Sequence, residues 1–454
     1  MKTFLTIWVG QLVSTLGSFM TVFALTLWVW DQTESATALT LVLFFAQLPR
    51  IVVTLFAGMI TDRFNRQRLM LLGDTSAAIS TAVVGVLWLT GSLQVWHLCA
   101  VMAVHGCFSQ LQQLAYSASI ALMVPKAQYT RAGSLNAALG FSAAILSPVF
   151  AGSLYPQIGL GGIMVIDLLT FTVAFGTLLS VKLPQPSQAE TKEKSLEQQL
   201  SDEPTQKALK FNLSDLTFGF RYIKASPGLS AMVIAFTLFA IPNDMGRALY
   251  NPMILARTGG DAQLLGTVTT MAGVGGVVGA LAVSIWGGFN RRIDGMLLGF
   301  IGTGVSKLAL GVGQSAWIWF PAQFFAHLHT PLIFSSSNAI WYAKVPPAIQ
   351  GKVLAADTLV GLLVGAFSPL LAGPLADYVF EPAMASGGWL APVFGPWLGT
   401  GPGSGIALLY CGSAIAMVAV GSLGYCFTTL RKVEQLIPDA DTVHAPCVEE
   451  NSTS

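Results

Sequence analysis

The segment SPVFAG at residues 147–152 returns as SPLLAG at residues 368–373, and this repeat decides the fold. The offset from the first proline to the second is 221 positions, from Pro148 to Pro369. Agreement at one fixed offset, across a loop and an apolar segment, indicates that the chain contains two copies of one unit. The same offset aligns Val124-Pro125 with Val345-Pro346, Arg131 with Lys352, and Asn136 with Asp357.

The composition around the repeat identifies the solvent as lipid. The chain has 454 residues, of which 53% are hydrophobic and only 10% are charged, which is too apolar for a soluble domain. A helix that crosses the hydrocarbon core needs roughly 20 apolar residues, because every backbone polar group must be paired within its own segment. We read such runs near 4–30, 36–60, 69–91, 96–123, 133–158, 160–182, 228–250, 263–288, 295–313, 316–343, 353–378 and 404–429.

The fold class follows from this count. We predict an all-α integral membrane protein with twelve transmembrane helices in two parallel six-helix repeats, with a cavity between them. The first run, from Phe4 to Trp30, is longer than the apolar part of a signal peptide and is expected to stay as the first helix.

Several functions are excluded by what the sequence lacks. The five cysteines show no C-x-x-C or other metal-ligand spacing, so we expect no metal centre, no cofactor and no disulfide framework. No nucleophile or phosphate-binding loop pattern is present, so we predict that the protein is not an enzyme. Nothing in the sequence predicts a nucleic-acid partner, and the expected assembly is a monomer.

The basic residues set the orientation in the membrane. Cytoplasmic loops carry an excess of Lys and Arg, and with the N-terminus inside only Arg247 and Arg257 fall on the outer side. We therefore predict a multi-pass plasma membrane protein with both termini in the cytoplasm.

A polar stretch separates the two copies. Its composition cannot bury enough apolar surface to fold alone. Beyond it, Leu213, Phe220 and Ile223 recur at helical spacing, which fits either a short amphipathic helix at the membrane surface or an extension of the following helix. The predicted units are an N-terminal half (1–182), a cytoplasmic linker with the amphipathic segment (183–227), a C-terminal half (228–430) and a cytoplasmic tail (431–454).

The loop GMITDRFNRQR at residues 58–68 resembles the G-x-x-x-D-R-x-x-R-[RK] signature of the major facilitator superfamily, with Gln67 in place of the last basic residue. Its glycine would allow close helix packing, and its aspartate would lie beside the positive N-terminal end of segment 353–378. The predicted role is a cytoplasmic gate that breaks on opening; the alternative is that the charges only set topology. The gate residues are Gly58, Asp62, Arg63, Arg66 and Arg68.

Within that superfamily the chain resembles the macrolide-efflux and enterobactin-exporter branch. The resemblance is carried by IWVGQLVSTLGS at residues 7–18, by Asp74 and by Ile166-Asp167. It implies secondary-active, proton-driven export of a small amphipathic organic compound, such as a drug, siderophore or secondary metabolite, by alternating access. The alternative is a non-transporting membrane subunit that anchors or regulates a partner protein.

The resemblance also places segments 4–30, 96–123, 228–250 and 316–343 around the cavity. Their polar side chains are the substrate candidates. A histidine among them can change its charge near physiological pH. The candidates are Gln11, Ser14, Ser18, His105, Gln110, Gln113, His327 and Asn338.

Ionisable side chains inside the bilayer are costly and are the candidates for coupling. Arg50 and Asp74 lie at compatible depths, so the sequence permits an ion pair between them and equally permits separate partners. Asp167 and Lys307 lie in segments that the resemblance makes peripheral, which favours a packing role.

The sequence allows two roles for each of two further carboxylates. Asp244, near the outer end of segment 228–250 with Arg247 at i+3, fits an outer gate pair or a coupling site. Asp357, near the cytoplasmic start of segment 353–378, fits a gate or a cap.

Overall fold

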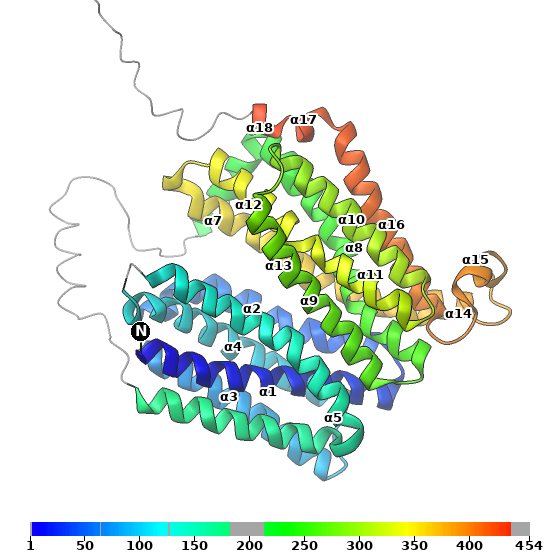
Figure 1. Cartoon of the computed structure of the whole chain (residues 1–454), viewed down its shortest axis with the longest axis horizontal. Coiled ribbons are helices and arrows are strands. Elements are labelled where there is room, and N and C mark those ends of the chain that lie inside the picture. Colours follow the sequence, from blue (N-terminus) through cyan, green and yellow to red (C-terminus); the bar gives the residue numbers. More distant parts are fainter. Residues whose placement is uncertain (1, 64, 126–127, 182–212, 437–454) are drawn as a thin grey trace, which may run out of the picture.

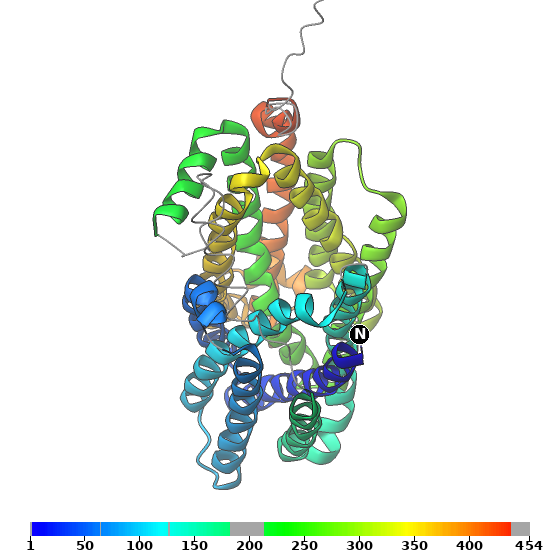
Figure 2. The ribbon, with the colours of Figure 1, turned by 90° about the vertical axis from the view of Figure 1, so that its left-hand side faces the viewer.

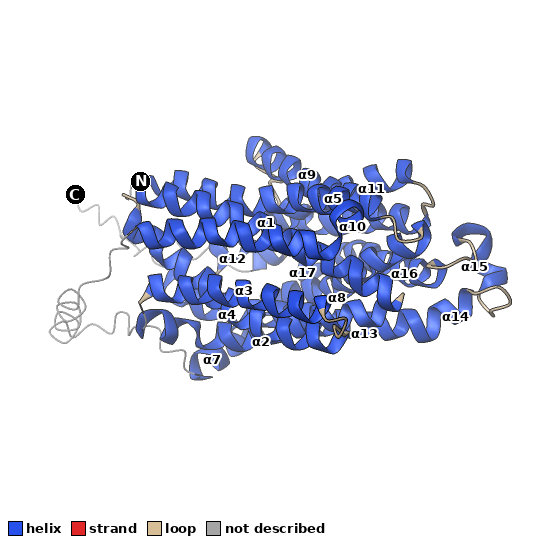
Figure 3. Cartoon of the chain, turned by 90° about the horizontal axis from the view of Figure 1, so that it is seen from below, coloured by secondary structure: helices blue, strands red, loops and turns tan. Residues whose placement is uncertain are grey.

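The computed structural model describes residues 2–63, 65–125, 128–181 and 213–436; the side chains of residues 2, 56–63, 118, 121, 122, 129, 130, 213–216 and 348 lie outside this description. Within these ranges every regular element is a helix (Figure 3). The first group contains α1 (Lys2–Thr33), α2 (Ala36–Arg63), α3 (Arg66–Leu89), α4 (Val95–Met123) and α5 (Tyr129–Ser180). The second contains α7 (Leu213–Ala225), α8 (Pro227–Thr258), α9 (Ala262–Trp286), α10 (Arg292–Val312), α11 (Ala316–Leu328), α12 (Thr330–Lys344), α13 (Pro347–Leu375), η2 (Ala376–Phe380), α14 (Glu381–Met384), α15 (Ala391–Leu398), α16 (Ser404–Cys426), α17 (Thr428–Arg431) and α18 (Val433–Leu436).

Nine helices within the described residues are long and apolar enough to cross a membrane. One of them, α5, spans 52 residues and contains Gly159 with non-helical backbone at φ 63°, which a glycine adopts without a steric penalty. Figure 1 shows α5 reversing its direction there. Counting α5 twice and adding α4 and the α11–α12 pair would give the twelve predicted spans, and that number stays a prediction.

The helices run between two ends of the bundle, which we name by their residues. The basic end is where α1 begins and where Arg66 and Arg291 lie at the starts of α3 and α10. The far end is where α1 passes into α2 and where α5 turns at Gly159. Figure 2, which looks onto the basic end, shows the two groups of helices one above the other.

The apolar cores show where the two groups are joined. One large cluster of buried side chains combines Trp30 of α1 with Leu249 of α8 and Tyr410 of α16, all near the far end. Toward the basic end the core divides: one cluster around Phe4 and Met70 belongs to the first group, and another around Trp341 belongs to the second. The groups are therefore fused at the far end and separate at the basic end, and in Figure 1 they diverge in the same direction.

Helices α5 and α9 touch through glycines near the far end. A Cβ atom added to Gly266 would lie 2.3 Å from the carbonyl oxygen of Pro148 and 3.3 Å from Cα of Gly152. The Thr270 hydroxyl donates to the carbonyl oxygen of Ile145 at 3.0 Å. Small residues allow helix backbones in a membrane to approach this closely, and one of these glycines, Gly152, ends the SPVFAG repeat.

Helix η2, which directly follows α13, makes the second junction with α2 through a carboxylate. Asp377 accepts hydrogen bonds from the Ser35 hydroxyl at 2.6 Å and from the backbone N–H groups of Ala36 and Thr37 at 3.1 and 2.8 Å. The first N–H groups of a helix have no partner within the helix and carry partial positive charge. The second group thus caps a helix of the first.

Helix α7 is separate from α8. Its last residue is Ala225, and Ser226 between them has an extended backbone at φ −105°, ψ 105°. A Cβ atom added to Gly219 would lie 2.4 Å from the carbonyl oxygen of Lys352, so α7 packs closely on α13. An extension of α8 is therefore excluded, while a membrane-surface position stays a prediction. Residues 183–212 of the predicted linker and 437–454 of the tail lie outside the described residues.

Arg257 fastens the far end of the second group. Its guanidinium donates to the carbonyl oxygens of Gly311 at 2.8 Å, Gly313 at 2.6 Å and Leu398 at 3.1 Å. Leu398 lies in a Gly/Pro-rich segment, residues 380–403, for which the sequence predicts no role. Arg257 ties that segment to the end of α8.

Arg257→Ala should lower the free energy of unfolding by about 2–4 kcal/mol, because it removes three hydrogen bonds from a charged group. The Gly313 carbonyl keeps a second donor, the Trp319 indole, at 2.8 Å. The measurement is the midpoint of thermal unfolding in detergent. The matched control is Arg247→Ala in the same helix, where a half-exposed side chain pairs with Asp244 and the expected loss is about 0–1 kcal/mol. Equal midpoints for the two variants would contradict this role.

Candidate functional site: a cavity between the two groups of helices

A cavity of about 510 Å³ lies among the helices of the first group and is closed by α8 of the second. This volume is in the range of sites that hold drug-sized compounds. The apolar side of its lining includes Phe19, Val22, Leu43 and Met102, and α8 contributes Ala248, Asn251 and Pro252. The site therefore lies mainly within the first group, where α8 of the second adds one part of the wall, and it can hold an amphipathic molecule.

The polar side of the cavity centres on a buried carboxylate. Asp74 is only 4% exposed and accepts hydrogen bonds from the side-chain amides of Gln11, at 3.1 Å, and Gln112. Gln112 also donates to the amide oxygen of Gln11 at 3.1 Å. Both oxygens of Asp74 thus receive N–H donors from α1 and α4, so the three helices share one closed network.

Arg50 does not pair with Asp74. Its Nε donates to the amide oxygen of Gln110 at 3.4 Å, while the two glutamines occupy the oxygens of Asp74. The ion pair that the sequence permitted is therefore absent from the described side chains. The amides of Gln11 and Gln112 bind both carboxylate oxygens in its place. Arg50 and Asp74 both line the cavity, through separate partners.

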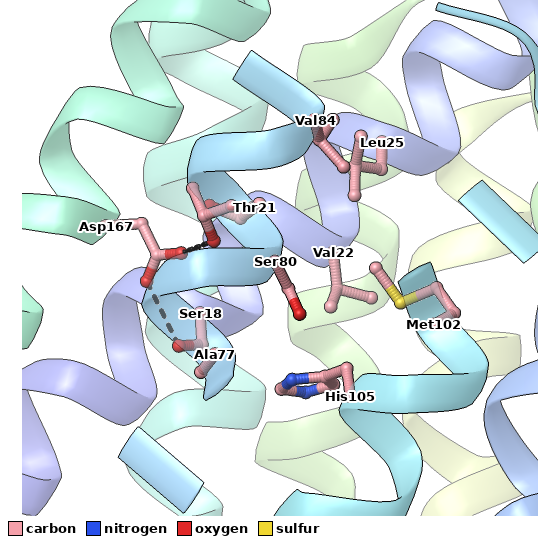
Figure 4. Close-up of a pocket in the computed structure, with 11 residues that line it drawn as sticks. Ser18, Thr21, Val22, Leu25, Ala77, Ser80, Val84, Met102, His105 and Asp167 are labelled. Carbon is pink, nitrogen blue, oxygen red and sulfur yellow. Dashed lines mark hydrogen bonds between the residues drawn. The ribbon is translucent and has the colours of Figure 1, made fainter. Parts of the chain in front are cut away.

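A side pocket of about 20 Å³ opens from the cavity and ends at Asp167. Six residues line both spaces: Ser18, Val22, Leu25, Ala77, Met102 and His105. This volume is enough for about one water molecule. Figure 4 shows Asp167 on one side of the pocket, with Ser80 and His105 facing each other across it.

The surroundings of Asp167 are hydroxyl groups. Asp167 is 5% exposed and accepts hydrogen bonds from Ser18 at 3.0 Å and Thr81 at 2.7 Å. The hydroxyl of Thr21 is also buried and lines the same pocket. A hydroxyl can donate or accept, whereas an amide N–H only donates. The site of Asp167 therefore accommodates both a carboxylate and a carboxylic acid, and the network of Asp74 fits the carboxylate.

The predicted substrate residues divide into two groups. Gln11, Ser14, Ser18, His105 and Gln113 line the cavity, and Gln110 contacts Arg50. The described lining does not include His327 or Asn338. The His327 ring is directed to the carbonyl oxygen of Gln323 in its own helix at 3.2 Å, and Asn338 is exposed elsewhere on α12.

The embedded charges of the second group lie away from the cavity. Lys307 is 6% exposed, and its ammonium group donates to the backbone and side-chain oxygens of Asn243 at 3.1 and 2.8 Å, which joins α10 to α8. Asp244 forms an ion pair with Arg247 at 3.1 Å. The prediction that Asp244 lies near a helix end is wrong, because α8 continues to Thr258 and Asp244 lies in the middle of this helix. Asp357 is partly buried in α13.

The predicted gate is only partly within the described structure. The side chains of Gly58, Asp62 and Arg63 lie outside it. Helix α3 begins at Arg66, and the N–H of Arg68 donates to the Asn65 side chain at 3.2 Å.

Gln67, the departure from the superfamily signature, has a definite position. Its amide donates to the carbonyl oxygens of Leu178 at 2.9 Å and Val181 at 2.8 Å. It ties the start of α3 to the end of α5.

Sequence reasoning missed Gln112 and Asp377. Gln112 lies at helical spacing from His105 and Ser109 on the face that lines the cavity, and this periodicity was a usable signal. Asp377 follows the second repeat by four residues, but nothing in the sequence indicates its distant partners.

Comparisons with known proteins agree with this architecture. Residues 1–453 match the family described as "Transmembrane secretion effector". Macrolide efflux protein A of Streptococcus pyogenes is 23% identical over 378 residues, covering 83% of this chain and 90% of its own. The multidrug efflux pump Tap of Mycolicibacterium fortuitum is 24% identical over 370 residues, covering 80% and 86%.

Solved structures support the same fold. A bacterial homologue of the human lysosomal transporter Spinster, inward-facing and unoccupied, superposes with a TM-score of 0.65 at 15% identity, covering 96% of this chain and 98% of its own. A POT family transporter in complex with a thioalcohol-conjugated peptide gives 0.66 at 13% identity, covering 95% and 96%. The predicted all-helical membrane fold and the superfamily are confirmed. The chain belongs to the transmembrane secretion effector family of the major facilitator superfamily, and it is a multi-pass membrane transporter and not an enzyme.

Proposed function

We propose that this transporter exports a small amphipathic organic compound by alternating access, driven by the proton gradient. The observation that carries the proposal is the cavity of about 510 Å³, which combines an apolar side with the polar network of Gln11, Asp74 and Gln112 and has α8 of the second group as one part of its wall. A membrane anchor without transport does not need such a cavity. The efflux pumps among the relatives support the direction of transport.

We place the basic end in the cytoplasm, in a monomer in the plasma membrane with both termini inside. The positive residues near α3 and α10 support this orientation. The structure then corresponds to an inward-open state, because the shared core and the contacts of Gly266 and Asp377 lie at the far end. A compound enters the cavity from the cytoplasm, and it leaves when the far-end contacts break and the basic end closes.

The coupling proton is carried by Asp167. Its two hydroxyl partners allow it to gain and lose a proton with small rearrangements. When Asp167 is protonated it donates to one hydroxyl oxygen, and that hydroxyl turns away. The side pocket gives the proton a path to the cavity, past His105. Two titratable groups of the packed helices lie next to this pocket: Asp74 lies seven residues before Thr81 on α3 and is held by amides, and His105 of α4 lines the pocket.

Transport by the purified full-length protein in liposomes tests this function. With an imposed pH gradient, at least one labelled amphipathic compound from a panel of macrolides, siderophores and lipopeptides should accumulate against its concentration gradient. A matched proton flux should appear in the same vesicles. If no compound moved and no proton flux appeared, the transporter mechanism would be refuted and the anchoring alternative favoured.

A further inference from the structure

We propose that the cavity binds compounds that carry an oxyanion group, held by Arg50. This inference rests on the proposed function only in taking the cavity as the binding site. It names the chemical class of the ligand: an apolar body with a carboxylate, sulfonate or phosphate.

The guanidinium of Arg50 is only weakly engaged by the protein. Arg50 lies in the middle of α2 and lines the cavity. The hydrogen bond from its Nε to Gln110 measures 3.4 Å, which is long for a charged donor. No described carboxylate forms an ion pair with it. Asp62 is twelve residues further along the same helix, which is about 18 Å away.

The packing of α4 on α2 leaves room for this side chain. A Cβ atom added to Gly106 would lie 2.4 Å from the carbonyl oxygen of Ala46 and 3.4 Å from Cγ of Arg50. Helices α2 and α4 are therefore in close contact at Gly106. Because Gly106 has no side chain, the aliphatic part of the Arg50 side chain can lie against it. Arg50 itself is part of the cavity lining.

The negative charges next to the cavity are already satisfied. Asp74 and Asp167 are 4% and 5% exposed, and each accepts two hydrogen bonds from neighbouring side chains. Among the described side chains of the lining, the incompletely partnered charge is therefore that of Arg50, which is positive. In a membrane-embedded site an arginine without an opposite charge is costly, and a bound oxyanion removes this cost.

The geometry of the guanidinium selects the ligand group. Its planar fork of N–H donors matches the two oxygens of a carboxylate, sulfonate or phosphate. The apolar side chains Phe19, Val22 and Leu43, which line the same cavity, suit the body of an amphipathic molecule. An uncharged analogue of the same shape retains the apolar contacts and loses the charged ones.

Equilibrium binding of two matched probes tests the proposal. The probes are N-dansyl-phenylalanine and its carboxamide, which share one shape and differ in charge. Dansyl fluorescence is titrated against the purified full-length protein in detergent. The wild type should bind the carboxylate at least about tenfold more tightly, as expected for hydrogen bonds to a charged group.

The variants isolate Arg50. Arg50→Gln should remove the preference and keep the affinity for the carboxamide, which also reports that the variant is folded. Arg50→Lys should keep part of the preference. The control is Arg221→Gln, an exposed arginine of α7, which should bind like the wild type. Added phosphatidylglycerol should not displace the carboxylate.

Four results would overturn the proposal: no binding of the carboxylate by the wild type, equal affinities for the two probes, a preference that survives in Arg50→Gln, or displacement by phosphatidylglycerol, which would assign the site to a lipid headgroup. The test is independent of transport. A preference for the anion without any transport would refute the proposed function alone, and transport together with any of these four results would refute this inference alone.

Discussion

Asp167→Asn should reduce proton-driven transport to the rate of protein-free liposomes while preserving downhill movement of the same compound. Asparagine has the shape of a protonated aspartate, and it can accept from one hydroxyl partner and donate to the other, Ser18 or Thr81. The fold and the cavity are therefore kept. Only the ability to release and rebind a proton is lost.

The measurement compares two rates in the same preparation of liposomes: uptake against a concentration gradient with an imposed pH gradient, and counterflow without one. Asp244→Asn and Asp357→Asn are the matched controls, because each removes another carboxylate from a membrane helix of the second group. Both should keep proton-driven transport. If Asp167→Asn transported normally and one of the controls did not, the proton-carrying role would be assigned to the residue changed in that control.

Gly266→Leu should strongly reduce transport by hindering closure of the far end. The first added carbon would lie 2.3 Å from the carbonyl oxygen of Pro148, a distance that forces α5 and α9 apart. Overpacking of a close contact costs about 1–3 kcal/mol, so the equilibrium shifts by a factor of about 5 to 150 toward the state that is open at the far end. Net transport should fall by at least a similar factor.

The control for this variant lies in the same helix. Gly276 has no atom within 4 Å of an added Cβ, so Gly276→Leu adds the same side chain to α9 without a collision. It should transport like the wild type. Similar losses in both variants would show that α9 tolerates no leucine, and the role of the Gly152–Gly266 contact would then be unsupported.

The architecture was readable from the sequence because lipid imposes a strong constraint. Length and apolarity alone identify membrane helices, and the offset between Pro148 and Pro369 relates the two copies. Five of the eight predicted substrate residues line the cavity, because helical spacing from Gln11 or His105 predicts which side chains share a face.

The site itself was less accessible to prediction because its contacts join distant parts of the chain. Asp74 is held by Gln11 and Gln112 from two other helices, and no local pattern distinguishes these amides from Arg50 as its partner. Asp377 caps α2 from more than 300 positions away. The end of α8 was placed too early because Asn251 and Pro252 interrupt an apolar run that continues to Thr258.

The most direct test of alternating access is the reactivity of one cavity residue from the two sides of the membrane. Asn251→Cys, in a background without the five native cysteines, is exposed to a membrane-impermeant maleimide in vesicles of either orientation. The account predicts labelling from the cytoplasmic side in the otherwise native protein, and a shift to labelling from the outer side when Gly266→Leu is added. Labelling from both sides at once, or no labelling from the outer side in either protein, would contradict it.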